Sequence, residues 1–173
     1  MARLLLIHHS PTRSLQSLTE RVLAGTRDES IDGVEVVERR ALDFATGDAT
    51  YQDILDADGY VLGTTANFGY MSGALKHVFD TTFLQVGGAL DDSGGAGAST
   101  EGSTGSATAG RPFGLYVHGR YDTTGAVRSV LSITGALGWK QGFAVLEAMG
   151  DVGDADLEAA YELGGTIAAL LTG

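Results

Sequence analysis

The sequence predicts one α/β domain in which helices cover both faces of a five-stranded parallel sheet. Short apolar runs typical of buried strands alternate five times with segments whose apolar residues recur at helical spacing. This alternation favours parallel strands joined by crossover helices. The length of 173 residues is enough for one domain with a real core, and hardly for two.

The first half of the chain contains three of the predicted strands. The run RLLLIH at 3–8 is followed by the turn-like HSPT and has the continuous apolar character of a strand buried on both faces. Leu15, Leu18 and Val22 then recur on one helix face, and Ser14 is the expected N-cap. The other elements expected in this half are strands at 34–39 and 60–64 and helices at 51–57 and about 72–84.

The second half predicts two more strands, each followed by a helix. Pro112 opens the first of them and is tolerated there, because the first residue of a strand need not donate to the ladder. Asp154 or Asp156 is the expected cap of the last helix. The expected elements are strands at 112–118 and 143–148 and helices at about 124–137 and 154–171.

One segment, 86–110, interrupts the alternation of strands and helices. It is rich in Gly, Ala, Ser and Thr and has almost no large apolar residues, so it is expected to be mobile and to contribute little to a core. A lid over an active site is one interpretation of such a segment. A flexible insertion is the interpretation that its composition favours.

The composition narrows the classes of partner. The formal net charge is -11, which argues against nucleic acid, because phosphate binding needs a basic face. The chain has no cysteine, so disulfides and thiol chemistry are excluded. No apolar run is long enough for a membrane span, and the N-terminal apolar run is too short for a signal peptide. We therefore expect no membrane partner and a cytoplasmic location.

In an open parallel sheet, ligands bind beyond the carboxyl ends of the strands, so the loops after the first, third and fourth strands are the candidates. The first loop, 8–17, offers the hydroxyls of Ser10, Thr12 and Ser14, the charge of Arg13 and the start of a helix. Such a helix start suits a phosphate. The alternative is a plain capped helix, since Ser and Thr are common there. Neither GxxxxGK[ST] nor GxGxxG follows the first strand, which argues against those nucleotide sites.

The second loop, TTANFGYMSG at 64–73, combines backbone freedom with flat side chains. Asn67 and Gly69 tolerate positive φ and allow backbone N–H groups to approach a ligand closely. Phe68 and Tyr70 offer flat apolar surface. The alternative is an ordinary βα turn with a core Phe and a surface Tyr.

The third loop, HGRYDTTGAV at 118–127, has a similar make-up. Tyr121 offers a ring for stacking, and Asp122 or Thr123 offers a hydrogen bond to a ligand or a cap for the next helix. A structural role is favoured for His118 over that of a proton donor. His8 and His9 have no carboxylate at metal-like spacing, so no metal site is expected.

These features together resemble a known superfamily. Ser10-x-Thr12 at the start of a helix resembles the phosphate loop of the flavodoxin-like superfamily. GTTANFGYMSGALKHVFD at 63–80 resembles the segment GTPxxFGxMSGxxKxxxD of its flavin-dependent NAD(P)H oxidoreductases and quinone reductases. The resemblance covers the chain except 86–110, and it implies a flavodoxin-like three-layer sandwich whose parallel sheet has the order 2-1-3-4-5.

The resemblance also implies a cofactor site for FMN. The phosphate is expected on the first loop and the isoalloxazine ring on the second, with the third loop across from it. The implied residues are Ser10, Thr12, Arg13, Ser14 and Leu15 for the phosphate, Thr65, Ala66, Asn67, Phe68 and Gly69 for the ring, and His118, Gly119, Arg120, Tyr121, Asp122 and Thr123 opposite. The chain departs from the pattern at Arg13, Leu15 and Thr65, where the superfamily has Gly, Thr and Pro.

The function implied is an FMN-dependent oxidoreductase that uses NAD(P)H as co-substrate and reduces a quinone, a flavin or a similar small-molecule electron acceptor. A homo-oligomer is expected by the same resemblance. No side chain is assigned a catalytic role. Two alternatives stay open: a flavodoxin-type electron carrier without its own substrate, steered by its acidic charge, and a flavin-free binding protein on the same fold, which the altered phosphate loop keeps open.

Overall fold

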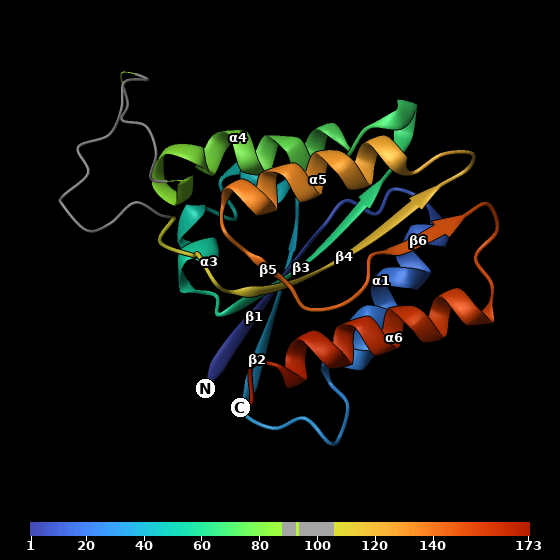
Figure 1. Cartoon of the computed structure of the whole chain (residues 1–173), viewed down its shortest axis with the longest axis horizontal. Helices are drawn as coiled ribbons and strands as arrows, with labels where there is room; N and C mark the ends of the chain where they lie inside the picture. Colours follow the sequence, from blue (N-terminus) through green and yellow to red (C-terminus); the bar gives the residue numbers. More distant parts are fainter. Residues whose placement is uncertain (88–92, 94–105) are drawn as a thin grey trace.

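A computed structural model describes residues 1–87, 93 and 106–173 of the chain, and the strands of this part form one parallel sheet (Figure 1). The strands are β1 (Ala2–His8), β2 (Val34–Arg40), β3 (Gly59–Thr65), β4 (Pro112–Gly119), β5 (Lys140–Gln141) and β6 (Leu146–Met149). Their order is β2-β1-β3-β4-β5, and β6 also pairs with β4. The predicted order 2-1-3-4-5 is therefore confirmed.

The helices form two layers, one on each face of the sheet (Figure 1). They are α1 (Arg13–Thr26), α2 (Asp43–Thr46), α3 (Tyr51–Asp56), α4 (Gly73–Gly87), α5 (Thr124–Ala136) and α6 (Asp154–Ala169), with a 3₁₀ turn η1 at Asn67–Gly69. α4 and α5 lie side by side on one face, and α1 and α6 cover the other. The predicted three-layer arrangement is confirmed.

The central strands are apolar because both of their faces are covered. In β1, Leu4 and Leu6 pack with the α1–α6 layer, while Leu5 and Ile7 pack with the opposite layer. Every residue of β3 is buried. The continuous apolar runs thus reflect a sheet buried on two sides, as expected for parallel strands.

The strand predicted at 143–148 is confirmed at 146–148, which belong to β6, but the prediction of a single strand at this edge is wrong. Pro112 of β4 pairs with Lys140, and Tyr116, four residues after Pro112, pairs with Leu146, which is six residues after Lys140. The edge strand thus has two more residues than β4 between these two pairs. The strand position at this edge is therefore split into β5 and β6. Gly142 lies in the gap, where an added Cβ would come within 2.7 Å of Leu170 Cδ1. Contact with the end of α6 thus coincides with the interruption.

Of the two predicted helix caps, the one at α1 is wrong and the one at α6 is confirmed in part. Thr12, not Ser14, is the N-cap of α1: its backbone is extended and its hydroxyl accepts from Leu15 N at 3.3 Å. Gly153 is the N-cap of α6, and the Asp156 side chain accepts its backbone N–H at 2.9 Å, whereas Asp154 makes no capping bond. The chain therefore enters α1 earlier than the sequence suggested, which brings Thr12 to the end of the loop.

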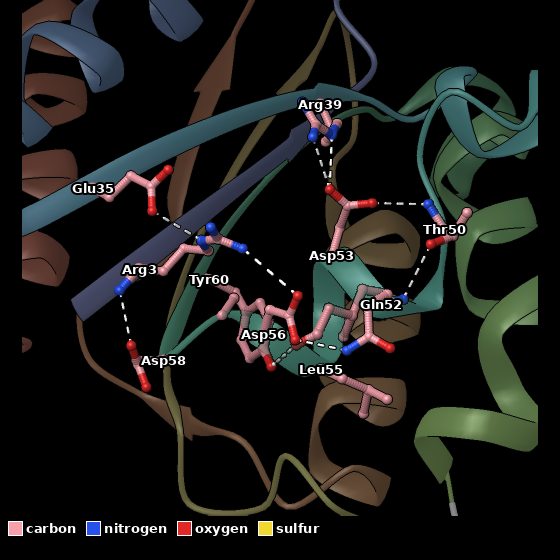
Figure 2. Close-up of polar contacts among 12 residues, drawn as sticks. Arg3, Glu35, Arg39, Thr50, Gln52, Asp53, Leu55, Asp56, Asp58 and Tyr60 are labelled. Atoms are coloured by element: carbon pink, nitrogen blue, oxygen red, sulfur yellow. Dashed lines mark hydrogen bonds and ion pairs between the residues drawn. The ribbon is translucent and has the colours of Figure 1, made fainter. Parts of the chain in front are cut away.

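Paired charges tie the two strands β1 and β2 to α3 (Figure 2). Arg3 of β1 lies between Glu35 of β2 and Asp56 of α3, at N–O distances of 3.1 and 3.7 Å. Arg39 pairs with Asp53, whose carboxylate also accepts from the backbone N–H of Thr50 in the N-terminal cap of α3. Both termini lie at the end of the sheet where β1 begins (Figure 1). These basic side chains are thus engaged with the chain's own carboxylates.

The ends of the segment 86–110 belong to the folded domain. Val86 and Gly87 are the last residues of α4, and the Ser106 hydroxyl donates to the Val86 carbonyl at 2.7 Å. Thr108 is fully buried, and its hydroxyl accepts from Trp139 Nε1 at 2.7 Å. The predicted mobility of the segment concerns 88–92 and 94–105, which lie outside the described residues.

The described residues contain neither a membrane-spanning helix nor a metal-binding group of side chains. In the part of the chain that the structure describes, no helix combines the length and the apolar character needed to cross a membrane. Within the same residues, no group of three or more His, Cys, Asp or Glu side chains is placed to hold a metal ion.

Candidate functional site

The carboxyl ends of the strands carry three loops that are tied to one another by backbone hydrogen bonds. His9 N donates to Gly63 O at 3.0 Å, and Ala66 N donates to His118 O at 2.9 Å. Gly150 N, after β6, donates to Gly119 O at 2.9 Å. The three loops that the sequence singled out therefore form one continuous edge, as their places after neighbouring parallel strands require.

The first loop presents the start of α1 to this edge. Thr12 and Arg13 are exposed, and the N–H groups of Thr12, Arg13 and Ser14 have no partner among the described residues. Leu15 N is the exception, because Thr12 accepts its proton. Arg13 forms no ion pair with a described residue. The loop thus offers unpaired donors and a cation, the donor set that an anion requires.

Ser10 is turned away from this surface. Its hydroxyl lies 2.9 Å from His8 Nδ1 and 2.8 Å from Thr19 Oγ1. The Ser10 carbonyl accepts from the Gln16 side chain at 3.1 Å. The hydroxyl of this predicted phosphate residue is therefore held by two side chains beneath the loop.

The second loop is strained at its tip. Phe68 adopts φ 56° and ψ 31°, a left-handed conformation that a bulky side chain rarely takes. Gly69 follows with φ 73°. Positive φ occurs at Phe68 and Gly69 rather than at Asn67. The Phe68 ring is fully exposed, so the alternative of an ordinary βα turn with a core Phe is wrong. Backbone strain that presents an apolar ring to solvent is typical of a ligand-binding loop.

Thr64 and Thr65, at the end of β3, point to opposite faces of the sheet. Thr64 Oγ1 accepts from Ser72 N at 2.9 Å and so anchors the start of α4. Thr65 is paired with His118 in register and lies on the α1 side of the sheet, because side chains alternate along a strand. It is 2% exposed, and its hydroxyl has no hydrogen-bond partner among the described residues. A buried hydroxyl without a partner is uncommon and indicates a missing one.

The third loop divides into inward and outward residues. His118 donates from Nε2 to Gly150 O at 2.8 Å, a structural role as the sequence favoured, and the buried Thr123 hydroxyl donates to Glu147. Asp122 accepts from Thr124 N at 3.0 Å, and this backbone hydrogen bond holds the pKa of Asp122 below its usual value. Tyr121 is 89% exposed.

The outward residues of the second and third loops enclose a pocket of about 330 Å³. Its lining combines two exposed aromatic rings with small and polar residues. The lining residues are Ala66, Asn67, Phe68, Gly69, Arg120, Tyr121 and Asp122. All seven are among the residues that the sequence analysis assigned to the ring site and its opposite wall. The structure thus brings that part of the predicted site together, and the residues of the first loop lie outside this pocket.

Sequence reasoning missed the contribution of the loop after β6. Asp151 pairs with Arg120 at 3.1 Å and so holds the rim of the pocket. It also missed a groove of about 400 Å³ beside Tyr70, between α4 and α5, that is lined by Lys76 and Arg128. Lys76 pairs with Asp80, whereas Arg128 has no ion pair with a described residue. Neither feature has a local signal, because each depends on residues more than 25 positions apart meeting in space.

Comparisons with known proteins agree with this architecture. No protein-family model matches the chain. Over 109 residues the chain is 31% identical to a flavodoxin of Aquifex aeolicus (strain VF5); the match covers 58% of this chain and 55% of that protein, so the chain spans about half the length of this relative.

Solved structures share the fold at low sequence identity. A flavodoxin from the domain Archaea has a TM-score of 0.70 and 14% identity, with 99% of each chain covered. A flavodoxin, WrbA-like protein from Agrobacterium tumefaciens has a TM-score of 0.72 and 16% identity over 99% of this chain and 98% of that one. Rubredoxin oxygen:oxidoreductase from Desulfovibrio gigas has a TM-score of 0.70 and 11% identity over 98% of this chain and 36% of that one. The strand order, the layers and these likenesses together show that the chain has the flavodoxin-like fold.

Proposed function

We propose that this protein is an FMN-dependent oxidoreductase that passes electrons from NAD(P)H to a quinone, a flavin or a similar small acceptor. The observation that carries the proposal is the slot between Phe68 and Tyr121, two exposed rings on neighbouring loops at the carboxyl edge of the sheet. A flat, mostly apolar ligand fits such a slot, and the start of α1, with its unpaired N–H groups, lies at the same edge to take an anionic tail.

The residues present fit FMN at the phosphate end. Among the described residues nothing pairs with the N–H groups of Thr12, Arg13 and Ser14 or with the Arg13 guanidinium, and a phosphate group requires such donors. Thr65 adds a buried hydroxyl that likewise has no described partner, on the α1 side of the sheet. Arg13 replaces the superfamily's Gly with a positive charge, which compensates for the lost hydroxyl at Leu15.

The residues also fit FMN at the ring end. Phe68 and Tyr121 supply the flat walls, and Ala66, Asn67 and Gly69 bring the backbone close to the ligand. Bound FMN would supply the two-electron redox chemistry between NAD(P)H and the acceptor. The chain's own part is to hold the ring, orient it and exclude water on one side. This division of labour needs no nucleophile, which agrees with a chain without cysteine.

The groove beside Tyr70 supports a second, anionic substrate. Arg128 and Lys76 line it, and in a protein of net charge -11 an arginine that no described carboxylate neutralises is a specific attraction for a phosphate-bearing molecule. NAD(P)H has such phosphates, which would lie in the groove beside Tyr70. Arg128→Ala is expected to raise KM for NADPH about tenfold with little change in kcat. Lys140→Ala, which removes an exposed charge in β5, is the matched control.

A second candidate function is an electron carrier. A flavodoxin of Aquifex aeolicus is among the relatives of this chain, and the net negative charge would steer a carrier to basic redox partners. Such a carrier would bind FMN and would exchange electrons with partner proteins, and it would not oxidise NAD(P)H by itself.

Reconstitution separates the candidates. The purified protein is titrated with FMN, and flavin fluorescence is followed until quenching saturates. Excess NADPH or NADH is then added without oxygen while the flavin absorbance is recorded. Rapid bleaching, followed by recovery when a quinone is added, supports the oxidoreductase. Binding without bleaching supports the carrier. An absence of FMN binding at millimolar concentration overturns both and leaves a flavin-free binding protein. Size-exclusion chromatography before and after FMN addition tests the expected homo-oligomer.

A further inference from the structure

The groove beside Tyr70 continues into a second cavity, of about 300 Å³, between α4 and α5. The two cavities share three lining residues, Lys76 of α4 and Ser132 and Ile133 of α5, so they are parts of one groove. The groove follows the two helices, which lie side by side (Figure 1). We call it the α4–α5 groove. Its size is that of a small-molecule site.

Small side chains keep the α4–α5 groove open. On the opposite face of the sheet, α1 and α6 meet backbone to backbone at Gly25 and Gly164. α4 and α5 pack less closely than α1 and α6, although α5 also turns small residues toward its neighbour. These residues recur at helical spacing and line the groove: Gly125, Ser129, Ser132 and Ala136. The space between the helices is therefore available to a ligand.

The second cavity of the groove is apolar and has a fixed aromatic wall. Trp139 stacks on Tyr60 with ring centroids 3.8 Å apart, and its Nε1 donates to Thr108, so the indole is held in place. Phe83 adds an exposed ring near the end of α4. The other apolar lining residues are Ile54, Phe79, Val86, Ile133, Ala136 and Leu137. Such a lining suits a flat aromatic ring.

The part of the groove beside Tyr70 is cationic. Arg128 lines it and forms no ion pair with a described residue. Glu147, which lines a neighbouring cavity together with Arg128, accepts instead from the Thr123 hydroxyl. Lys76 lies where the two cavities join and is paired with Asp80. Arg128 is thus the cation that remains for an anionic group of a ligand.

The groove begins next to the loop that carries Phe68. Gly125, at this end of the groove, packs on the backbone of Gly69. Further along α5 come Arg128 and then Ala136 in the apolar cavity, with a rise of about 12 Å between these two residues. A flat slot, a cation and an apolar cavity therefore follow one another. A nicotinamide, a diphosphate and an adenosine follow one another in the same way in NAD(P)H.

We infer that the α4–α5 groove binds the adenosine half of NAD(P)H, with the diphosphate at Arg128 and the adenine against Phe83 and Trp139. The inference rests on the proposed function for its ligand. The exposed Ser132 hydroxyl and the Asp80 carboxylate supply hydrogen bonds to the ribose and the adenine amino group. Recognition of this kind needs no glycine-rich dinucleotide motif, and none follows the first strand of this chain.

The first test uses ADP-ribose, which contains the diphosphate and the adenosine but no nicotinamide. Trp139 is the only tryptophan of the chain, so its fluorescence reports on the apolar cavity. Titration of the protein with ADP-ribose, without FMN, is expected to give a saturable change. Ala136→Phe fills the cavity and is expected to weaken binding of both ADP-ribose and adenosine about tenfold or more. Arg128→Ala is expected to weaken ADP-ribose about tenfold and to leave adenosine unchanged.

Ala24→Phe is the matched control. It makes the same change at an exposed alanine near the end of α1, in the layer on the other face of the sheet, and should bind both probes like the wild type. If Ala136→Phe does not fold, Phe83→Ala takes its place, because it removes the exposed ring on which the adenine would stack.

The second test measures turnover with reduced nicotinamide mononucleotide, which lacks the adenosine. The wild-type protein, loaded with FMN, is expected to have a KM about tenfold higher for this reductant than for NADH. Ala136→Phe is expected to raise KM for NADH about tenfold and to leave KM for reduced nicotinamide mononucleotide unchanged. A general structural defect would change both constants, so the difference between the two reductants isolates the adenosine site.

The outcomes separate this inference from the proposed function. Binding of ADP-ribose by a protein whose FMN is not bleached by NADH or NADPH keeps the nucleotide site and overturns the oxidoreductase. Equal KM for NADH in the wild type and Ala136→Phe, with no response of Trp139 to ADP-ribose, overturns the inference while the oxidoreductase stands. Neither bleaching nor a response of Trp139 overturns both. A dimer that Ala136→Phe dissociates, and that does not bind ADP-ribose, assigns the groove to a second copy of the chain and also overturns the inference.

Discussion

Gly125, at the start of α5, packs directly on the backbone of Gly69 in the loop after β3. A Cβ on Gly125 would lie 1.8 Å from the Gly69 carbonyl oxygen and 2.9 Å from its carbonyl carbon. No side chain fits that space, and the neighbour is backbone, so it cannot rotate away. The start of α5 therefore sets the position of the loop that carries Phe68, and the two walls of the slot are held relative to each other by a contact between two glycines.

Gly125→Ala is expected to push the 67–69 loop away and open the slot. The overpacking should lower the free energy of unfolding by about 1–3 kcal/mol and weaken FMN binding by about tenfold or more, the equivalent of 1.4 kcal/mol. Urea denaturation and fluorescence quenching by FMN measure the two effects. Gly135→Ala is the control, because nothing lies within 4 Å of its added Cβ in the same helix. It should be neutral or stabilising by up to about 1 kcal/mol. Unchanged FMN binding by Gly125→Ala would show that the contact does not shape the site.

Phe68 allows a test in which stability and binding move in opposite directions. Its left-handed backbone costs about 1–2 kcal/mol for a non-glycine residue, and Asn adopts this conformation more easily. Because the Phe68 ring is fully exposed, its removal loses no burial. Phe68→Asn is thus expected to keep or raise the free energy of unfolding by up to about 1 kcal/mol, and to weaken FMN binding about tenfold through lost stacking.

Phe68→Tyr is the matched control, because it keeps both the ring and the strain. It should leave stability and FMN affinity nearly unchanged. If Phe68→Asn binds FMN as tightly as the wild type, the ring at position 68 is not a wall of the site.

The architecture could be predicted because it depends on local patterns. The apolar runs of β1 and β3 and the spacing of Leu15, Leu18 and Val22 are properties of short windows, and all three of these side chains are buried in the structure. The alternation of strand and helix then leaves few topologies. The positions of the candidate ligand loops were predictable for the same reason, since each loop follows the end of a predicted strand.

The rest could not be predicted because it depends on distant residues. The exposure of Phe68 follows from a left-handed backbone that α5 holds in place through Gly125, far along the chain. The split between β5 and β6 coincides with packing of α6 on Gly142. The hydrogen-bonded chain from Glu38 through His8, Ser10 and Thr19 to Tyr116 joins side chains of β2, β1, α1 and β4, and no short window of sequence contains them.

Replacing 88–105 by a short Gly-Ser linker is expected to leave the domain folded. Val86 and Ser106 are already in contact, at 2.7 Å between the carbonyl and the hydroxyl, so a few residues suffice to close the gap. The free energy of unfolding should stay equal or rise, by about 0.6 kcal/mol for each halving of the loop length.

Thr108→Val is the contrasting variant at the folded end of this segment. It leaves Trp139 Nε1 buried without an acceptor and should lower the free energy of unfolding by about 1–3 kcal/mol.

The same linker variant separates the two interpretations of this segment. Unchanged NADPH turnover and FMN affinity would agree with an insertion without a catalytic role. A folded variant with a clear loss of turnover would favour the lid.

Gly164 tests the other layer, where α1 and α6 approach without side chains between them. A Cβ on Gly164 would lie 2.1 Å from the Val22 carbonyl oxygen, and one on Gly25 would lie 2.0 Å from the Tyr161 carbonyl oxygen. Helix propensity alone predicts that Gly164→Ala stabilises by about 1 kcal/mol. The close approach predicts the reverse, a loss of about 1–3 kcal/mol or more, because both helix backbones must separate. Gly165→Ala is the neighbouring control, since its Cβ would meet the Gly25 carbonyl oxygen only at 3.4 Å, an ordinary contact. Thermal and urea unfolding of the two variants decide the sign of the change in the free energy of unfolding.

Because the slot and the first loop lie at the sheet edge and not between these helices, FMN affinity per folded molecule should be unchanged in Gly164→Ala. Equal stability of the two variants would mean that α1 and α6 can move apart freely, and the glycine pair would then not be what holds this layer together.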